Sequence, residues 1–279
     1  MTELEGNSAG RRVKAPTGGF KSAARRNSTA VTMIRIGAVL AFFLGWFIIG
    51  HVGGGLFVPT PESTIVRLVE LAQGPIWGPL LESNISLFIG FPAASILGIA
   101  LGSLLARNTI ADRALGFYVD ALMVIPTISI VPIIVVAFGL TLNARVVVVM
   151  LFVLPIVALT TRGAITTVDA ALLQMARSFG AGVWFTWRTV MLPAVLGPIA
   201  SGLRVALAHG IAGMIVIELV LTPVGIGGML QNSRARFDAP ELYAVTLAIL
   251  LEGFILVGLA TVGERVLQRR LSHSSKATK

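Results

Sequence analysis

The chain of 279 residues contains no cysteine and few charged residues. Lys, Arg, Asp and Glu together make up 13% of the sequence, whereas hydrophobic residues make up 55%. A soluble domain normally carries about a quarter charged residues, so this composition excludes an ordinary soluble protein. The lack of cysteine excludes a disulfide scaffold, Cys-ligated zinc, an iron–sulfur cluster and thiol catalysis. The three histidines, His51, His209 and His273, are far apart in the sequence and offer no metal-ligand spacing.

The chain also lacks the G-x-x-x-x-G-K-[ST] sequence that forms the phosphate-binding loop of many ATPases. Its run of three glycines, residues 53–55, has no strand–helix context and predicts a turn instead. We therefore expect no ATP binding by this chain through that motif, and no cofactor of its own.

Long stretches without Lys, Arg, Asp or Glu dominate the remaining sequence. A helix that crosses a bilayer needs roughly 20 largely apolar residues. The stretches predict six spans, at about residues 34–56, 84–106, 117–138, 144–164, 201–221 and 242–264. The sequence therefore predicts an all-α membrane protein with about six transmembrane helices.

Basic residues are distributed unevenly between the two sides of these spans. Lys and Arg are enriched in cytoplasmic loops. If the N-terminus lies in the cytoplasm, all but four of the 22 basic residues fall on the cytoplasmic side. The four exceptions are Arg67, Arg145, Arg234 and Arg236. We therefore expect both termini in the cytoplasm, and the net charge of +9 needs no nucleic-acid partner.

Polar composition marks both ends of the chain. Residues 1–32 are rich in Gly, Ser, Thr, Arg and Lys and predict a disordered basic cytoplasmic tail, either solvated or resting on anionic lipid. Residues 33–265 form the predicted membrane domain, and residues 266–279 a cytoplasmic C-terminal tail. Between the first two spans, we expect a short interfacial helix that is capped by Ser63. Its apolar face comprises Ile65, Leu68, Val69 and Ala72.

The segment after the fourth span, residues 165–200, is too long for a plain turn. Val168–Ser178 predicts a helix, and Gly180 is placed to end it in a left-handed conformation. A second helical stretch follows, and Leu192-Pro193 is expected to stop it before the fifth span. Its apolar stripe comprises Val183, Trp184, Trp187, Val190 and Met191. The sequence thus predicts a cytoplasmic helix–glycine–helix hairpin that inserts into a groove on a partner.

The spacing of Gln174-Met175-Ala176, Gly180, Val190 and Leu192-Pro193 resembles a known loop. It is similar to the EAA loop of binding-protein-dependent ABC transporter permeases. In that loop Glu-Ala-Ala is followed after three residues by Gly, and after nine more by Ile-x-Leu-Pro. Every interval agrees, and the chain departs from the pattern at Gln174, Met175 and Val190. The glutamine argues against a role that needs a negative charge at this position.

Further motifs over about residues 60–265 resemble the nitrate/sulfonate/taurine/bicarbonate branch of this family. They are the Ala176–Ala181, Leu192–Ala194, Ser201–Arg204, Val216–Leu219 and Gly225–Gly227 runs, and Pro126 and Pro132 with Phe138-Gly139. The resemblance implies a type I ABC importer-like fold. Its implied function is import of a small organic or inorganic anion of the sulfonate, taurine or nitrate type.

The resemblance also implies partners and a location. Two cytoplasmic subunits would bind ATP and Mg, and a solute-binding protein would deliver substrate from outside. A second permease copy, most simply in a homodimer, would complete the pore in the lipid of the bacterial inner membrane. The ATPase-coupling residues carried over from the loop are Gln174, Met175, Ala176, Arg177, Gly180, Leu192 and Pro193.

Two other classes of function stay open from the residues alone. One is an ion-gradient-driven secondary transporter or channel that works without an ATPase. The other is a membrane scaffold that moves nothing. The transporter without an ATPase gives no reason for the long helical loop at residues 165–200.

Ionisable residues inside a membrane span are functional candidates. His209 and Glu252 fall near the midplane of the fifth and sixth spans, where we expect them to face the bundle interior and form a hydrogen bond. They belong either to the translocation pathway or to a structural pair. Glu218 and Arg145, near the outer span ends, form either an outer gate or two separate interfacial charges in water.

Pro126 and Pro132 are expected to kink the third span and Pro155 the fourth, which frees backbone groups that must face protein or a cavity. Thr127 and Ser129 are expected to line such a cavity. In the second span, Gly90, Gly98 and Gly102 are spaced for close helix packing rather than for substrate binding. Since no Lys or Arg sits deep in a span, selectivity for an oxyanion should reside in the binding protein.

Overall fold

The computed structural model describes residues 20–53, 57–220 and 224–274, and the regular structure in those residues is helical. Five helical segments are long and apolar enough to cross a membrane. They are Val31–Val52 of α1 (Phe20–Val52), α3 (Trp77–Arg107), α6 (Leu142–Thr166), the Val183–Val220 segment that contains α9 (Leu192–Val220), and Ala239–Arg269 of α11 (Ala239–Ser274). A bent pair of helices brings the number in the described residues to six when the pair is counted as one span, which confirms the predicted all-α membrane fold.

The third predicted span, residues 117–138, is bent near its prolines, as expected, but far more sharply than a kink within one helix. It is divided into α4 (Thr109–Val124), a short 3₁₀ turn (Thr127–Ser129) and α5 (Val131–Phe138), with a bend of 93°. Proline disfavours helical dihedral angles in the residue before it. Ile125, which precedes Pro126, accordingly has an extended backbone with φ −68° and ψ 128°. The apolar composition of the segment is right, but the proline turns the chain.

The core of the bundle lies where α3, α6 and α9 pack together. Gly90 and Gly98 on α3 face α6 so closely that a Cβ at either position would lie 2.8 Å from Val149 or Val157. Gly90 and Gly98 are themselves buried. The glycines of α3 therefore serve helix packing, as the sequence predicts. The main hydrophobic cluster contains Leu87, Ala94, Val149, Val153, Ile156, Val157, Ala206, Ile211 and Met214.

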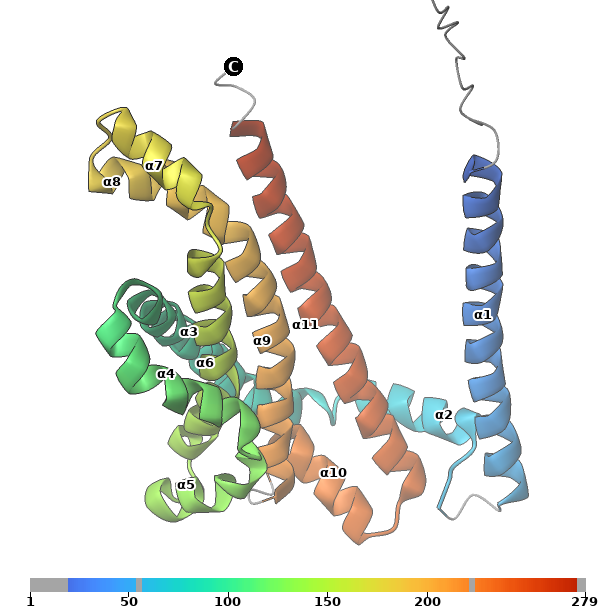
Figure 1. The fold of residues 1–279 in the computed structure, drawn as a ribbon. Coiled ribbons are helices and arrows are strands. Elements are labelled where there is room, and N and C mark those ends of the chain that lie inside the picture. The colour runs from blue at the N-terminus through green and yellow to red at the C-terminus, as the bar shows by residue number, and fades with distance from the viewer. Residues whose placement is uncertain (1–19, 54–56, 221–223, 275–279) are drawn as a thin grey trace, which may run out of the picture.

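α1 stands apart from the bundle and meets it near its C-terminal end (Figure 1). The indole Nε1 of Trp46 donates a hydrogen bond to the carbonyl of Pro59 at 3.0 Å, and its ring stacks on Tyr243 of α11. The helix begins at Phe20, within the predicted disordered tail. Gly18 and Gly19 precede this start and no Gly or Pro follows until Gly37, so nothing interrupts the helix earlier. Residues 1–19 lie outside the described part.

The other end of the chain is also more helical than the sequence analysis expects. α11 continues to Ser274, through most of the predicted C-terminal tail of residues 266–279. Residues 275–279 lie outside the described part. The tail begins with the sequence Val-Leu-Gln-Arg-Arg-Leu, which contains no helix breaker, so the span simply runs on.

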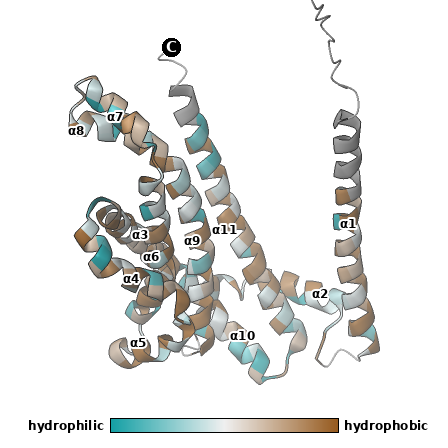
Figure 2. Cartoon of the chain, viewed as in Figure 1, coloured by the Kyte–Doolittle hydropathy of each residue, from teal (hydrophilic) through white to brown (hydrophobic). Residues whose placement is uncertain are grey.

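The two ends of the bundle carry different elements (Figure 1). α7 (Ala170–Ser178) and α8 (Val183–Thr186) lie at the same end as the start of α1 and the end of α11, and we call this the hairpin end. α2 (Pro61–Ala72) and α10 (Gly225–Ala235) lie at the opposite end, called the α10 end. Figure 2 shows hydrophobic residues along the middle of α11 and a hydrophilic α10.

The short helix expected between the first two spans is present as α2, but its cap is Thr60 rather than Ser63. The Thr60 side chain accepts the backbone N–H of Ser63 at 3.3 Å. Thr60 precedes Pro61, and proline is preferred in the first turn after a cap. Of the predicted apolar face, Ile65 and Val69 are exposed on the surface of the single chain.

Candidate functional site

The hairpin of α7 and α8 is built as the sequence predicts. The Asp169 side chain caps α7 by accepting the backbone N–H of Ala171 at 2.8 Å. Gly180 ends the helix with φ +73°, a left-handed conformation that favours glycine. The N–H of Gly180 donates to the carbonyl of Arg177 at 2.9 Å, and the N–H of Ala181 donates to the carbonyl of Ala176 at 3.0 Å. These two bonds form a Schellman motif, which turns the chain back towards the bundle.

The coupling residues predicted from the EAA-like pattern lie on the surface of this hairpin. Gln174, Met175 and Arg177 are exposed on α7, and Ala176 is half-buried. The turn beyond them presents large apolar side chains, since Phe179 is 85% exposed and Trp184 is 72% exposed. An exposed apolar patch of this kind marks a surface for a protein or membrane partner.

The sequence predicts that Leu192-Pro193 ends the second helix of the hairpin, and this prediction is wrong. Trp187–Met191 forms a π-helical turn that joins α8 to α9, so Val183–Val220 is one continuous helical segment. The N–H of Leu192 donates to the carbonyl of Trp187, five residues earlier. Pro193 lies inside this segment and has no N–H to donate to the preceding turn. The wider π-helical turn before it lets the helix continue past the proline.

A buried ion-pair cluster lies towards the α10 end, where the sequence places Arg145 and Glu218. Nη1 of Arg145 lies 3.7 Å from Oε1 of Glu218, and Nη2 lies 3.4 Å from Oε1 of Glu82. Glu218 is 0% exposed and Arg145 is 8% exposed. The predicted pairing is therefore present, and the alternative of two separate charges in water is wrong. Whether the pair acts as a gate stays a prediction.

Glu218 also holds the first turn of α10. Its Oε2 accepts hydrogen bonds from the hydroxyl of Ser83 at 2.7 Å and from the N–H of Gly227 at 3.1 Å. The Ser83 hydroxyl in turn accepts the N–H of Ile226 at 2.9 Å, and Glu82 accepts the N–H of Gly225 at 3.2 Å. Three otherwise unpaired N–H groups of the helix start are thus satisfied by two carboxylates and a hydroxyl.

Sequence reasoning missed Glu82 and Ser83, although a signal was available. Together with Asn84 they form a run of three polar residues directly before the apolar part of the second span. The span itself begins at Trp77, seven residues earlier than expected, so this run lies inside α3. A polar run inside a membrane helix must find partners within the protein.

Asn84 is a hydrogen-bond partner of Glu252. Its Nδ2 donates to Oε1 of Glu252, which ties α3 to α11. His209 lies exposed on α9 in the single chain. The expected hydrogen bond between His209 and Glu252 is therefore wrong for this chain, because an amide on a third helix takes its place. A pathway role for either residue stays a prediction.

Thr127 and Ser129 lie in the 3₁₀ turn at the bend between α4 and α5. Thr127 is half-buried and Ser129 is exposed. The bend places both outside the packed interface of α3, α6 and α9. Their predicted role as cavity-lining residues stays a prediction.

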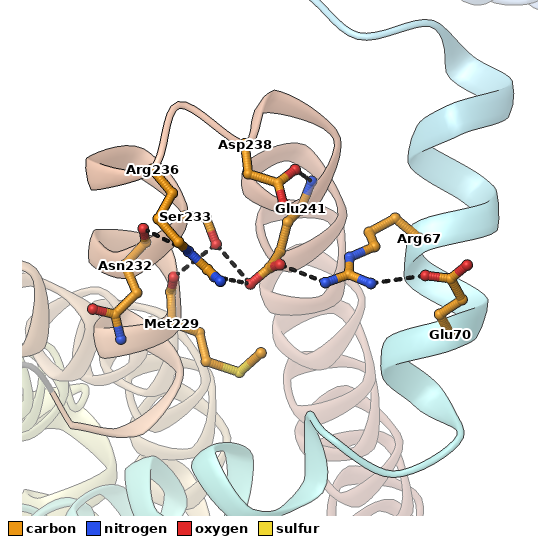
Figure 3. A network of polar contacts seen from close by, with 8 residues as sticks. All are labelled: Arg67, Glu70, Met229, Asn232, Ser233, Arg236, Asp238 and Glu241. Atoms are coloured by element: carbon orange, nitrogen blue, oxygen red, sulfur yellow. Dashed lines mark hydrogen bonds and ion pairs between the residues drawn. The ribbon is translucent and has the colours of Figure 1, made fainter.

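A second polar network joins α2, α10 and α11 and escaped the sequence analysis (Figure 3). Glu241, 4% exposed, accepts hydrogen bonds from Arg67 at 2.6 Å, Arg236 at 2.9 Å and Ser233 at 3.0 Å. The bonds to Glu241 and then Glu70 raise the pKa of the Arg67 guanidinium above its usual value. The partners are up to 174 residues apart in sequence, so no local pattern announces them.

Apolar spans around a buried charged cluster, with an exposed hairpin at one end, define the membrane-embedded subunit of a larger assembly. Comparison with known proteins agrees with this class. Residues 94–273 match the family described as "Binding-protein-dependent transport system inner membrane component". The chain belongs to this family, and it is a multi-pass inner-membrane permease subunit of an ABC importer rather than an enzyme.

Curated relatives cover most of the chain. The taurine transport system permease protein TauC of Escherichia coli is 27% identical over 228 residues, covering 78% of this chain and 80% of the relative. The riboflavin transport system permease protein RibX of Chloroflexus aurantiacus is 30% identical, covering 76% and 80%. The putative aliphatic sulfonates transport permease protein SsuC of Escherichia coli is 29% identical, covering 82% and 84%.

A solved structure shares the fold. The chain is similar to a chain in the inward-facing MetNI methionine ABC transporter, with a TM-score of 0.55 and 22% sequence identity. The match covers 72% of this chain and 95% of the other. The resemblance of the sequence to ABC importer permeases is thus confirmed, including its branch, since taurine and sulfonate permeases are among the relatives.

Proposed function

We propose that this permease subunit imports a small organic anion of the sulfonate or taurine type. In this proposal, ATP-binding subunits drive it by docking on the α7–α8 hairpin, and ATP and Mg are bound there rather than in this chain. An extracytoplasmic binding protein delivers the substrate, and a second copy of the chain completes the pathway.

The hairpin is the observation that carries the proposal. It presents Phe179 and Trp184 to the outside, and α7 and its turn pack little against the rest of the chain. A preformed, exposed pair of short helices suits a groove on a partner. Continuity of α8 with the α9 span gives a docked partner a direct mechanical connection to the membrane.

The proposed orientation of the chain in the membrane follows from the distribution of basic residues. The hairpin end carries the basic flanks of the chain, which favours the cytoplasm for this end and for both termini. The α10 end then faces outwards, where a binding protein would dock. The predicted basic tail of residues 1–32 and the C-terminal segment of residues 266–279 would lie beside the ATP-binding subunits.

The proposed substrate class comes from the names of the relatives, which include taurine and aliphatic sulfonates permeases as well as a riboflavin permease. Three arginines of α6 and α9 are neutralised within the chain. Arg145, Arg162 and Arg204 each form ion pairs with carboxylates of the chain. An anion would then be selected mainly by the binding protein.

Substitution of Gly180 by alanine tests the docking. Gly180 has φ +73°, and no heavy atom would lie within 4 Å of a Cβ added there, so alanine strains only the backbone of the turn. The left-handed conformation costs an alanine about 1–2 kcal/mol. We expect Gly180→Ala to reduce co-purification of the ATP-binding subunit and ATP-driven uptake, while the permease remains in the membrane.

Gly182 supplies the matched control. It lies two residues away, has no close neighbour, and has φ −65°, which alanine adopts freely. Gly182→Ala should therefore retain the ATP-binding subunit. Equal retention in both variants would contradict docking through this turn. The ligand found on the cognate binding protein then decides the substrate class, and a ligand without an anionic group would contradict that part of the proposal.

A further inference from the structure

A cleft of about 220 Å³ lies between the end of α3 and the hairpin. Its walls include Arg107 of α3, Arg177 of α7, Thr186 of α8, and Trp187 in the π-helical turn, with Leu173 and Met191 as apolar walls. The described residues that line it include two arginines and no Asp or Glu. Arg145, Arg162 and Arg204, in contrast, are each paired with carboxylates.

One of these arginines contacts an aromatic ring. Cζ of Arg107 lies 5.5 Å from the centroid of the Trp187 ring, within range of a cation–π interaction. Trp187 in turn stacks on Trp184, with centroids 6.4 Å apart and an interplanar angle of 8°. The cation–π contact leaves the N–H donors of the guanidinium available to a ligand. It also restricts the positions of the Arg107 side chain before any anion arrives.

Neither arginine has a counter-charge within the part of the chain that the structure describes. Arg107 and Arg177 form no ion pair there. Two like charges that line one small cleft repel each other, and a shared anion removes that cost. Arginine pairs best with planar or tetrahedral oxyanions, to which its forked donors bind in a bidentate way.

The position of the cleft selects among such anions. It lies where α3, a membrane-spanning helix, ends, and it is flanked by two tryptophans, which favour the interfacial level of a bilayer. Basic pockets between membrane helices at this level bind the phosphates of lipid head groups. We propose that the cleft between Arg107 and Arg177 binds a phosphate group, either in the head group of an anionic phospholipid or as free phosphate.

This inference goes beyond the proposed transport function, because it requires only the cleft and the contact of Arg107 with Trp187. Its consequence is that the position of the hairpin depends on whether the cleft holds an anion. An occupied cleft would bridge α3 and α7 through their two arginines and hold the hairpin at a fixed angle to the bundle. Lipid composition would thereby act on the element to which the ATP-binding subunit docks.

The test compares Arg107→Gln with Arg113→Gln in the full transporter complex reconstituted into nanodiscs. Arg113 is an exposed arginine of α4 that does not line the cleft, so it controls for loss of general basic charge. Native mass spectrometry measures the phosphatidylglycerol retained from discs that also contain phosphatidylcholine. In a second arm, inorganic phosphate is titrated into pure phosphatidylcholine discs while tryptophan fluorescence is recorded. Thermal unfolding confirms that each variant is folded.

We expect Arg107→Gln, and likewise Arg177→Gln, to weaken phosphatidylglycerol retention by roughly tenfold, as for the loss of one charged hydrogen bond. Arg113→Gln should leave it unchanged. Saturable phosphate binding without a preference for phosphatidylglycerol would support the same site with free phosphate as its ligand. Equal binding in all variants would overturn the proposal. So would release of the ATP-binding subunit by Arg107→Gln without any lipid or phosphate binding, since an acidic side chain of that subunit would then fill the cleft.

Discussion

Glu218 of α9 and Gly227 of α10 touch so closely that no side chain fits between them. The carboxylate accepts the Gly227 N–H at 3.1 Å, and a Cβ added at position 227 would lie 3.1 Å from the backbone carbonyl carbon of Glu218 and closer still to its Cβ. Position 227 therefore requires glycine because of its neighbour, not because of its own dihedral angles. The contact fixes α10 against the end of a membrane span.

Gly227→Ala should separate these two helices. Because the opposing atoms include backbone, they have little freedom to move, and overpacking of this kind costs about 1–3 kcal/mol. We expect a lower midpoint of thermal unfolding in detergent. Gly253→Ala is the control, since no heavy atom lies within 4 Å of its added Cβ. A Gly227 variant as stable as the Gly253 variant would show that the two helices separate freely.

Removal of the Glu218 carboxylate should reduce the stability of the fold more than its neutralisation does. Glu218→Ala leaves the Ser83 hydroxyl and the Gly227 N–H without their acceptor and Arg145 with only Glu82, at a cost of about 3 kcal/mol. Glu218→Gln keeps an acceptor oxygen, so we expect it to lose less. Thermal unfolding of both variants measures the difference. Similar losses would mean that charge alone, rather than hydrogen bonding to α10, determines the contribution of this residue.

Glu241→Gln should loosen α2 from α10 and α11. The substitution removes the charge that Arg67 and Arg236 share, which we expect to cost about 2 kcal/mol. Hydrogen–deuterium exchange in Pro61–Ala72 should rise. Glu70→Gln provides the comparison, since Glu70 also binds Arg67 but is 53% exposed, and exposed pairs contribute little. Exchange that rises equally in both variants would contradict a special role for Glu241.

Gly213 and Phe152 should show coupled effects on stability. A Cβ on Gly213 would lie 2.7 Å from Cγ of the Phe152 ring, so Gly213→Ala should destabilise the contact of α9 with α6. Phe152→Ala removes the ring and leaves a cavity, which also destabilises. In the double variant the new methyl group partly fills that cavity. We expect the combined loss to fall short of the sum by about 1 kcal/mol, measured by thermal unfolding of all four proteins.

Local signals in the sequence were sufficient for the spans and the hairpin. Hydropathy located the membrane segments, and the spacing of Gly180 within residues 165–200 predicted the reversal between two helices. The kink expected at the prolines of the third span is in fact a bend of 93°, because composition indicates length in the membrane but not direction. The helix through Pro193 was missed because a π-helical turn has no sequence pattern as clear as a proline.

Contacts between distant residues could not be read from the chain. Glu218 binds Ser83, 135 residues away, and Glu252 binds Asn84, 168 residues away, so each partner was one of many polar residues in other spans. Charge and membrane depth identified Arg145 and Glu218 as partners, because few ionisable residues share their level. The same rule misplaced His209 beside Glu252, since an amide was not counted among the possible partners.

The uninterrupted helix from Val183 to Val220 has a mechanical consequence. Its 38 residues measure about 57 Å along the helix axis, which curves between α8 and α9 (Figure 1). One end of this helix lies in the turn that faces the cytoplasm in our proposal. The other end lies two residues beyond Glu218, whose carboxylate is hydrogen-bonded to the first turn of α10. Close contacts of Gly202, Gly210 and Gly213 with α6 supply the fulcrum. Unless the helix flexes at Pro198, a tilt imposed on one end swings the far one the opposite way and carries α10 with it.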